Sequence, residues 1–364
     1  MATFRVRFMG LFMVLLSAYH CMPDNKTVGN DRFNKPLKLS KVITLTPDVS
    51  ELVRRAGYPG NISYSSFTNQ WIFSDSNGTV GLNKTIFLDS FRIKETDTLV
   101  NNTKPTYPCL FPFGNQILII ERVTKKVIRI DLTSGHPILI KDSISIPTLK
   151  AFSEYYNMND ADNQYFNLNG SICLLANYGL WEERNPNYID TAVFVVISNN
   201  KVLKKIGKYP REYKQMVYKR AAIFRMDHEQ NIYYSFEGQD SVYKMNLSGN
   251  ILARSILHDF PVRKPFNKGK ITDLAYVRNY LATNEVNVSM KIIDNRFILI
   301  VKQLAQHDVK ASKKIKYFVF DKDLNKLYSD TLKNPVFPFA FETRNGFGFL
   351  SDSLKKFYEY DLKY

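Results

Sequence analysis

A strand–turn–strand pattern recurs along this chain and constrains its fold more than any other feature. Residues 231–256 (NIYYSFEGQDSVYKMNLSGNILARSI) give it most clearly, as three short runs rich in aromatic and β-branched residues, separated by turns at 237–240 and 248–250. Runs of this kind, bounded by Gly, Asn, Asp and Ser, are typical of β-strands. The pattern predicts an all-β protein built from small antiparallel sheets.

Five further segments carry the same pattern with unequal lengths. They span residues 71–99, 115–142, 172–206, 296–332 and 347–362. A unit of three or four antiparallel strands cannot bury both of its faces alone, so the units must stack, and stacking around an axis closes the set. We therefore predict an all-β, six-bladed β-propeller with irregular insertions. The unequal spacing favours the alternative, an irregular two-domain β-sandwich.

The two ends of the body supply a further prediction. A closed propeller is commonly completed by a strand from the N-terminal side, and residues 35–47 (KPLKLSKVITLTP) alternate suitably for that strand. Helical periodicity is scarce, and residues 47–57 (PDVSELVRRAG) are the best helix candidate, with Gly57 as a stop signal. We expect residues 39–364 to form one propeller domain.

The N-terminus has the features of an export signal. Arg5 and Arg7 precede an uncharged stretch at residues 8–19, and no acidic residue occurs before Asp24. This stretch has the length of a signal-peptide core and is too short to span a bilayer as a helix. The sequence predicts a signal peptide at residues 1–20 and a flexible tether at residues 21–38.

Cys21 follows the apolar stretch after one residue, His20, within LLSAYHCMPDN. An aliphatic pair, small residues and then a cysteine are typical of a bacterial lipoprotein signal, so we predict that Cys21 is acylated and anchors the protein to a membrane by lipid. The expected location is the cell envelope, periplasmic or at the cell surface. The alternative is a cysteine that only happens to lie near a cleavage site. Cys109 and Cys173 form either one disulfide or two buried thiols, and their spacing does not choose between these.

The acylation-type cysteine is followed by blades such as NIYYSFEGQDSVYKMNLSGNI and a closing segment PVFPFAFETRNGFGFLSDSLKKFYEYDL. In these features the chain resembles the TolB-like six-bladed propeller lipoproteins of the Bacteroidetes type, over residues 40–364. The family's function is largely unassigned, and its motifs mark the blade, not an active site. The resemblance implies a periplasmic or cell-surface protein with a binding or scaffolding role.

The charge balance favours anionic partners. Fifty Lys and Arg residues against 34 Asp and Glu residues give a formal charge of +16. The densest stretch, residues 201–220, is interpreted either as lysines on solvated loops and strand edges or as a surface for anionic glycan, lipid or nucleic acid. Nucleic acid is the least favoured of these partners, because no known nucleic-acid-binding motif accompanies the charge.

No catalytic motif occurs, and we predict no catalytic residues, no metal site and no cofactor. One segment, residues 179–188 (GLWEERNPNY), gathers an aromatic residue with charged ones. Trp181 is a candidate to stack on a sugar or aromatic ligand, and Glu182 and Arg184 are candidates to hydrogen-bond it. A surface loop packed by Trp181 is the alternative.

Two functions remain open at this stage. The first is a lipid-anchored propeller that binds or scaffolds a protein or an anionic glycan. The second is a propeller-type hydrolase or lyase whose residues converge from several blade loops and so leave no local motif. Ionisable side chains converging near the centre of the fold would favour the enzyme, because catalytic acids and bases must lie within reach of one another.

Overall fold

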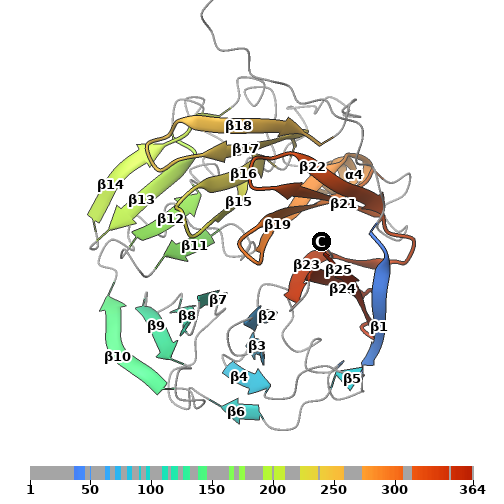
Figure 1. Ribbon diagram of the computed structural model, residues 1–364, viewed down its shortest axis with the longest axis horizontal. Helices are drawn as coiled ribbons and strands as arrows, with labels where there is room; N and C mark the ends of the chain where they lie inside the picture. Colours follow the sequence, from blue (N-terminus) through green and yellow to red (C-terminus); the bar gives the residue numbers. More distant parts are fainter. Residues whose placement is uncertain are drawn as a thin grey trace, which may run out of the picture.

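The computed structural model (Figure 1) describes the backbone of the chain in separate ranges. These ranges are residues 37–45, 50, 62–65, 70–74, 80–83, 90–91, 96–98, 109–113, 116–121, 126–131, 138–145, 164–167, 172–176, 192–198, 201–209, 222–236, 238–257, 273–305, 314–343 and 346–362. All but one of the secondary-structure elements named in them are β-strands, so the predicted all-β class is confirmed.

The described strands form six sheets, each made mainly from consecutive strands of the chain, and all their pairs are antiparallel except that of β1 with β5. The first three sheets contain β2 (Ile62–Ser65), β3 (Gln70–Ser74), β4 (Val80–Asn83) and β6 (Thr96–Thr98); β7 (Cys109–Phe113), β8 (Gln116–Glu121), β9 (Lys126–Asp131) and β10 (Ile138–Ser145); and β11 (Gln164–Asn167), β12 (Ile172–Ala176), β13 (Phe194–Ser198) and β14 (Lys201–Ile206).

The other three sheets follow the same order. They contain β15 (Ala222–Met226), β16 (Ile232–Phe236), β17 (Ser241–Met245) and β18 (Ile251–Ile256); β19 (Val286–Ile293), β20 (Phe297–Gln303), β21 (Ile315–Asp321) and β22 (Lys326–Thr331); and β23 (Val336–Thr343), β24 (Gly346–Ser351), β25 (Lys356–Asp361), β1 (Leu39–Leu45) and β5 (Ser90–Phe91). The segments predicted as repeats therefore fall on successive sheets.

The six sheets form a closed, propeller-like ring (Figure 1). The first strand of each sheet lies near the centre, and these inner strands contact one another in the order β2, β7, β11, β15, β19, β23 and again β2. Closure explains why no sheet needs a second layer of its own: each face is covered by the next sheet.

The predicted closing strand is confirmed. Strand β1 pairs antiparallel with β25, with Val42 opposite Tyr358 and Ile43 opposite Phe357. The Leu45 amide also donates to the Lys355 carbonyl at 2.9 Å. The sheet that contains the C-terminus is thus completed by a strand from the start of the body, so unfolding one end exposes the other.

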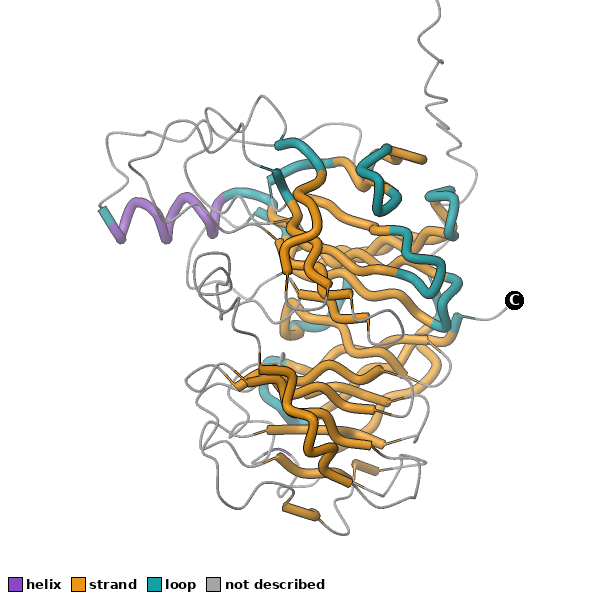
Figure 2. The backbone as a smooth tube through the Cα atoms, turned by 90° about the vertical axis from the view of Figure 1, so that its left-hand side faces the viewer, coloured by secondary structure: helices purple, strands orange, loops and turns teal. Residues whose placement is uncertain are grey.

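The sheets present two different ends. At one end, the first strand of each sheet is joined to the second, and the third to the fourth. We call this end the turn face. The connection face is the opposite end, where second and third strands are joined and the chain passes between sheets. Figure 2 shows helix α4 on the connection face and the C-terminus on the opposite side.

Helix α4 (Leu274–Thr283) lies between β18 and β19 and was not predicted. Asp273 caps it, with its Oδ1 accepting from the amides of Ala275 and Tyr276 at 3.0 Å. The predicted helix at residues 47–57 lies outside the described residues except for Ser50. Within the described ranges, no helix is both long and apolar enough to cross a bilayer.

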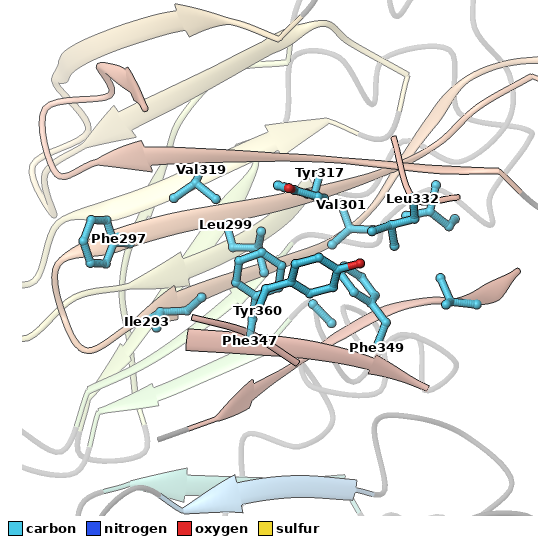
Figure 3. Close-up of a cluster of buried hydrophobic side chains, with 13 residues drawn as sticks. Ile293, Phe297, Leu299, Val301, Tyr317, Val319, Leu332, Phe347, Phe349 and Tyr360 are labelled. Atoms are coloured by element: carbon cyan, nitrogen blue, oxygen red, sulfur yellow. The ribbon is translucent and has the colours of Figure 1, made fainter. Parts of the chain in front are cut away.

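Apolar cores fill the spaces between neighbouring sheets in the described half of the ring. Figure 3 shows the core between the β19–β22 sheet and the closing sheet, where the rings of Phe347 and Tyr360 stack with centroids 5.6 Å apart. Phe347 and Phe349 are fully buried, and burying each such side chain contributes about 1.5–3 kcal/mol. Gly348 lies against the Phe357 ring, where a Cβ atom would clash.

One turn design recurs in the described residues. Asp227, Asn246, Asp321 and Ser351 each accept the backbone amide four residues ahead through a side-chain oxygen. The residue before that amide adopts a positive φ: it is Gln230, Gly249, Leu324 and Leu354, respectively. Short polar side chains at the first position therefore specify these tight turns, as the turn predicted at residues 248–250 requires.

Candidate functional site

Three ionisable side chains occur at the same level on three neighbouring inner strands. Arg225 is next to the last residue of β15, Lys291 lies two residues before the end of β19, and Glu342 is next to the last residue of β23. We call them the inner-strand cluster. Since β15 contacts β19 and β19 contacts β23, strand order brings the three residues together near the centre of the ring, toward the turn face.

The environment of Glu342 differs from that of a surface carboxylate. Burial raises the pKa of its carboxyl from 4.5 to about 7. A hydrogen bond from the Asp294 backbone amide and the positive charges of Lys291 and Arg225 oppose this rise, whereas the Asp294 carboxylate adds to it. Glu342 therefore changes its charge near neutral pH.

The two cations of the cluster remain within reach of solvent. Arg225, Lys291 and Glu342 are all half-buried. The Arg225 Nη1 donates to the carbonyl of Phe224 at 2.7 Å, which holds the guanidinium close to its own strand. Asp294, at the turn beside Glu342, forms an ion pair with Arg296. Two cations beside one acid that can lose its charge form an arrangement suited to binding an anionic group.

A second group of charges lies between the β15–β18 and β19–β22 sheets, toward the connection face. We call Lys302, Asp240, Glu285 and Asn287 the inter-sheet polar cluster. Only 1% of the Lys302 side chain is exposed, and its Nζ forms ion pairs with Asp240 and, at 3.0 Å, with Glu285. This ammonium group is closed to solvent, and its pairs join β20 to the β16–β17 turn and to Glu285, just before β19.

Asn287 completes that link. Its Nδ2 lies 2.8 Å from Ser235 Oγ, 2.9 Å from the Phe236 carbonyl and 2.6 Å from the Gln239 carbonyl. The Asn287 side chain is fully buried. Buried polar groups bonded in this way fix one packing of the two sheets, so we assign the inter-sheet polar cluster a structural role.

The residues predicted as functional from the sequence are Cys21, Trp181, Glu182 and Arg184, and all four lie outside the described residues. In the sequence, Trp181 lies between strands β12 and β13. The last residue of β12, Ala176, and the first residue of β13, Phe194, both lie at the connection face. The inner-strand cluster lies toward the turn face. The roles assigned to Trp181, Glu182 and Arg184 stay predictions.

The structure describes residues 201–209 of the lysine-rich stretch at residues 201–220. Lys204 and Lys205 are exposed on β14, the outer strand of the third sheet. This placement fits the interpretation of lysines on a strand edge, where charge discourages pairing with another chain. Residues 210–220 of the stretch lie outside the described residues.

Sequence reasoning missed all three residues of the inner-strand cluster. A signal was available, because each of the three is the one charged residue of its strand. The strand sequences are AIFRM in β15, VNVSMKII in β19 and VFPFAFET in β23. A charge at such a position is either paired or functional. Within the described ranges, no group of three or more His, Cys, Asp and Glu side chains is arranged to hold a metal ion.

Comparisons with known proteins support the fold. No protein-family model and no curated protein sequence matches the chain. Among solved structures, a member of the DUF4221 family from Bacteroides vulgatus has a TM-score of 0.61 at 13% identity, covering 88% of this chain and 96% of that one. This likeness concerns the fold alone.

Two further solved structures have lower TM-scores. A candidate exported protein from Bacteroides fragilis has a TM-score of 0.47 at 13% identity, covering 83% of this chain and 78% of that one. The C-terminal WD40 domain of Sif2 has a TM-score of 0.40 at 9% identity, covering 83% of this chain and 69% of that one.

Proposed function

We propose that this protein is an exported, lipid-anchored, six-bladed β-propeller that binds a protein or an anionic glycan partner in the cell envelope. Each of the six sheets is one blade, and residues 39–364 form the single propeller domain; β1, the first described strand, begins at Leu39. Residues 1–20 are the signal peptide and residues 21–38 the tether to an acylated Cys21. The resemblance to TolB-like lipoproteins belongs to this proposal.

The observation that carries the binding role is the inner-strand cluster. Arg225 and Lys291 place two positive charges near the centre of the ring, beside one carboxylate whose pKa lies near neutrality. Charge-assisted hydrogen bonds to carboxylate or phosphate oxygens are among the strongest in proteins. The net charge of +16 adds a long-range attraction for a polyanion.

Binding of an acidic polysaccharide tests this function. We expect the purified body to retain polygalacturonate but not the neutral polymer dextran, measured by affinity electrophoresis with each polymer in the gel. Because salt screens exposed charges, retention should weaken as ionic strength rises. Equal mobility in the presence and absence of polygalacturonate at low salt would contradict the glycan form of the proposal.

The lipid anchor is tested separately. We expect Cys21→Ser to move the full-length protein from the membrane fraction to the soluble fraction, since the substitution removes the acylation site. The intact mass of the detergent-extracted wild-type protein should show a diacylated or triacylated cysteine as its first residue. Unchanged membrane retention of the variant would overturn the anchoring part of the proposal.

One observation favours the enzymatic alternative. A carboxyl group with a pKa near the working pH is suited to general acid–base catalysis, and Glu342 has this property beside two cations. A hydrolase or lyase acting on an acidic glycan would create new reducing ends, which Glu342→Gln would abolish. If incubation of the wild-type protein with polygalacturonate produces no new ends, only the binding function is retained for this polymer.

A further inference from the structure

Strand β18, residues 251–256, is the outer strand of its sheet and concentrates exposed apolar side chains. Among the described residues, four large apolar side chains are exposed, and three of them belong to this strand: Ile251, Leu252 and Ile256, at 50%, 52% and 43%. Figure 1 shows β18 on the outside of the ring. Adjoining exposed apolar groups of this kind indicate a surface that another molecule covers.

The backbone of β18 offers hydrogen-bonding groups on this outer side. The Leu257 amide donates to the Asp240 carbonyl at 2.8 Å. Since the residues that bond to one neighbour alternate along an antiparallel pair, Ser255 also turns its amide and carbonyl to β17, whereas Arg254 and Ile256 turn theirs outward. Strand β18 is last in the strand order of its sheet, so these outward groups are a template for one more strand. We call this side of residues 251–256 the β18 edge.

A β-bulge limits the part of the β18 edge that can form a regular ladder. Ala253 and Ile251 pair with consecutive residues of β17, so Leu252 has no opposite residue. Pairing is regular over residues 253–256, which include both residues with outward backbone groups. An added strand therefore forms its hydrogen bonds at the second half of β18.

Charge protects the β18 edge less than it protects another outer strand. Strand β14, in the third sheet, exposes Lys204 and Lys205, and such charges discourage an added strand. The one charged residue of β18 is Arg254, whose Nη2 donates to Ser241 Oγ at 2.9 Å and whose Cζ lies 5.5 Å from the centroid of the Tyr243 ring. Both partners belong to β17, so the guanidinium is drawn over its own sheet and leaves the β18 edge open.

We infer that the β18 edge binds an extended segment of a partner protein, which adds to this sheet as a fifth strand. The segment has an acidic residue opposite Arg254 and an apolar residue opposite Ile256, because directly opposite side chains lie on the same face of a sheet and interact. This inference rests on the proposed function, of which it specifies the protein partner.

The charges of the chain favour such a partner over a second copy. Strand β18, with the sequence ILARSI, contains no acidic residue, so two copies paired through this strand leave each Arg254 without an acid. The net charge of +16 also opposes self-association, and it attracts a segment with acidic side chains.

Fluorescence anisotropy with a labelled peptide tests the inference. The probe is GSTVTETVTSG, in which valine and threonine alternate around one glutamate, and we expect it to bind the purified full-length protein saturably. N-methyl groups on the glutamate and both valines, whose amides face β18, should weaken binding about tenfold or more, the effect of losing two or more hydrogen bonds. N-methyl groups on the two threonines beside the glutamate, whose amides point away from β18, should leave binding unchanged.

Variants of the protein test the same contact from the other side. Ile256→Lys removes the central apolar contact, so we expect binding about tenfold weaker or more. Arg254→Glu should weaken binding of the glutamate peptide about fivefold and should favour the same peptide with lysine in place of glutamate, because opposite charges attract across a strand pair. Thermal unfolding confirms that each variant is folded.

The matched control is Val42→Lys. Val42 is 47% exposed on β1, in another sheet, and its substitution changes the net charge as Ile256→Lys does. The control should bind the peptide like the wild type.

Undiminished binding by Ile256→Lys, or equal binding of the unmodified peptide and the peptide methylated on glutamate and valine, would overturn this inference. A dimer in analytical ultracentrifugation that Ile256→Lys dissociates would assign the β18 edge to a second copy and would also overturn it. Retention of the wild type by polygalacturonate is measured separately, so the glycan-binding form of the proposed function stands or fails on its own.

Discussion

The inner-strand cluster and the inter-sheet polar cluster contain similar residues but differ in their surroundings. Each places lysine beside carboxylates at a junction of neighbouring sheets, and strand β19 contributes to both, Lys291 to the first and Asn287 to the second. Near the connection face, Lys302 is closed off and paired with two acids. Near the turn face, Lys291, Arg225 and Glu342 are half-buried and keep contact with solvent.

The difference lies in burial and in contact with solvent. The ammonium of Lys302 has two carboxylate partners and the Asn287 Nδ2 has three acceptors, although the buried Asn287 Oδ1 has no hydrogen-bond partner. In the inner-strand cluster, Lys291 and Arg225 lie near one carboxyl group whose charge burial disfavours. A closed, paired cluster stabilises the packing of two sheets, whereas a group with a shifted pKa near solvent is a candidate for function.

The largest effect is expected at Lys302. Lys302→Met leaves Asp240 and Glu285 without their shared cation in a buried place, and breaking a buried ion pair on one side costs about 3–5 kcal/mol. We expect the free energy of unfolding, measured by denaturant titration, to fall by this amount. Lys244→Met is the control, because its partner Asp323 is 82% exposed and such pairs contribute less than about 1 kcal/mol. Similar losses in the two variants would contradict the structural role of the inter-sheet polar cluster.

Asn287→Ala tests the same junction without changing its charge. The substitution leaves Ser235 Oγ and the carbonyls of Phe236 and Gln239 without their amide donor, so we expect a loss of about 2–3 kcal/mol in unfolding free energy. Asn279→Ala, at an exposed position on α4, should change stability by no more than about 0.5 kcal/mol. If Asn287→Ala is as mild as this control, the two sheets are held by apolar packing alone.

Much of the fold was predictable because most strands carry a local signal. The outer three strands of each sheet, such as β16 to β18, alternate with polar turns and were recognised as repeats. The inner strands were missed as parts of these repeats. Strand β15 (AIFRM) is almost wholly buried and shows no alternation, and β19 is separated from the preceding sheet by the 257–285 link and has a register shift between Asn287 and Ser289.

The candidate site was not predictable in the same way. Arg225, Lys291 and Glu342 belong to three different sheets, and only closure of the ring brings their strands together. No spacing along the chain encodes this arrangement, since each residue is a single charge in its own strand. The local cluster at Trp181, Glu182 and Arg184 attracted attention because its residues are adjacent in sequence, a property that a site built by closure does not need.

A third stability effect is expected at Glu342, and it differs from the other two because it depends on pH. In the unfolded chain its carboxyl ionises near pH 4.5, whereas in the folded protein it keeps its proton up to about pH 7. Between these values the folded state binds more protons than the unfolded state, so stability falls as pH rises through this window. The loss is nearly complete above pH 7 and amounts to about 3 kcal/mol. Glu342→Gln should not show this loss.

We therefore expect Glu342→Gln to match the wild type at pH 4.5 and to exceed it in unfolding free energy at pH 8, measured by denaturant titration at both pH values. Glu359→Gln, which removes a carboxylate from β25 in the same sheet, should keep the wild-type pH profile. An equal fall of stability with pH in Glu342→Gln and the wild type would mean that Glu342 is ionised in the folded protein at neutral pH. In that case the attraction of Lys291 and Arg225 outweighs the cost of burying the charge of Glu342, and this carboxylate forms part of a stable charge network as those of Asp240 and Glu285 do.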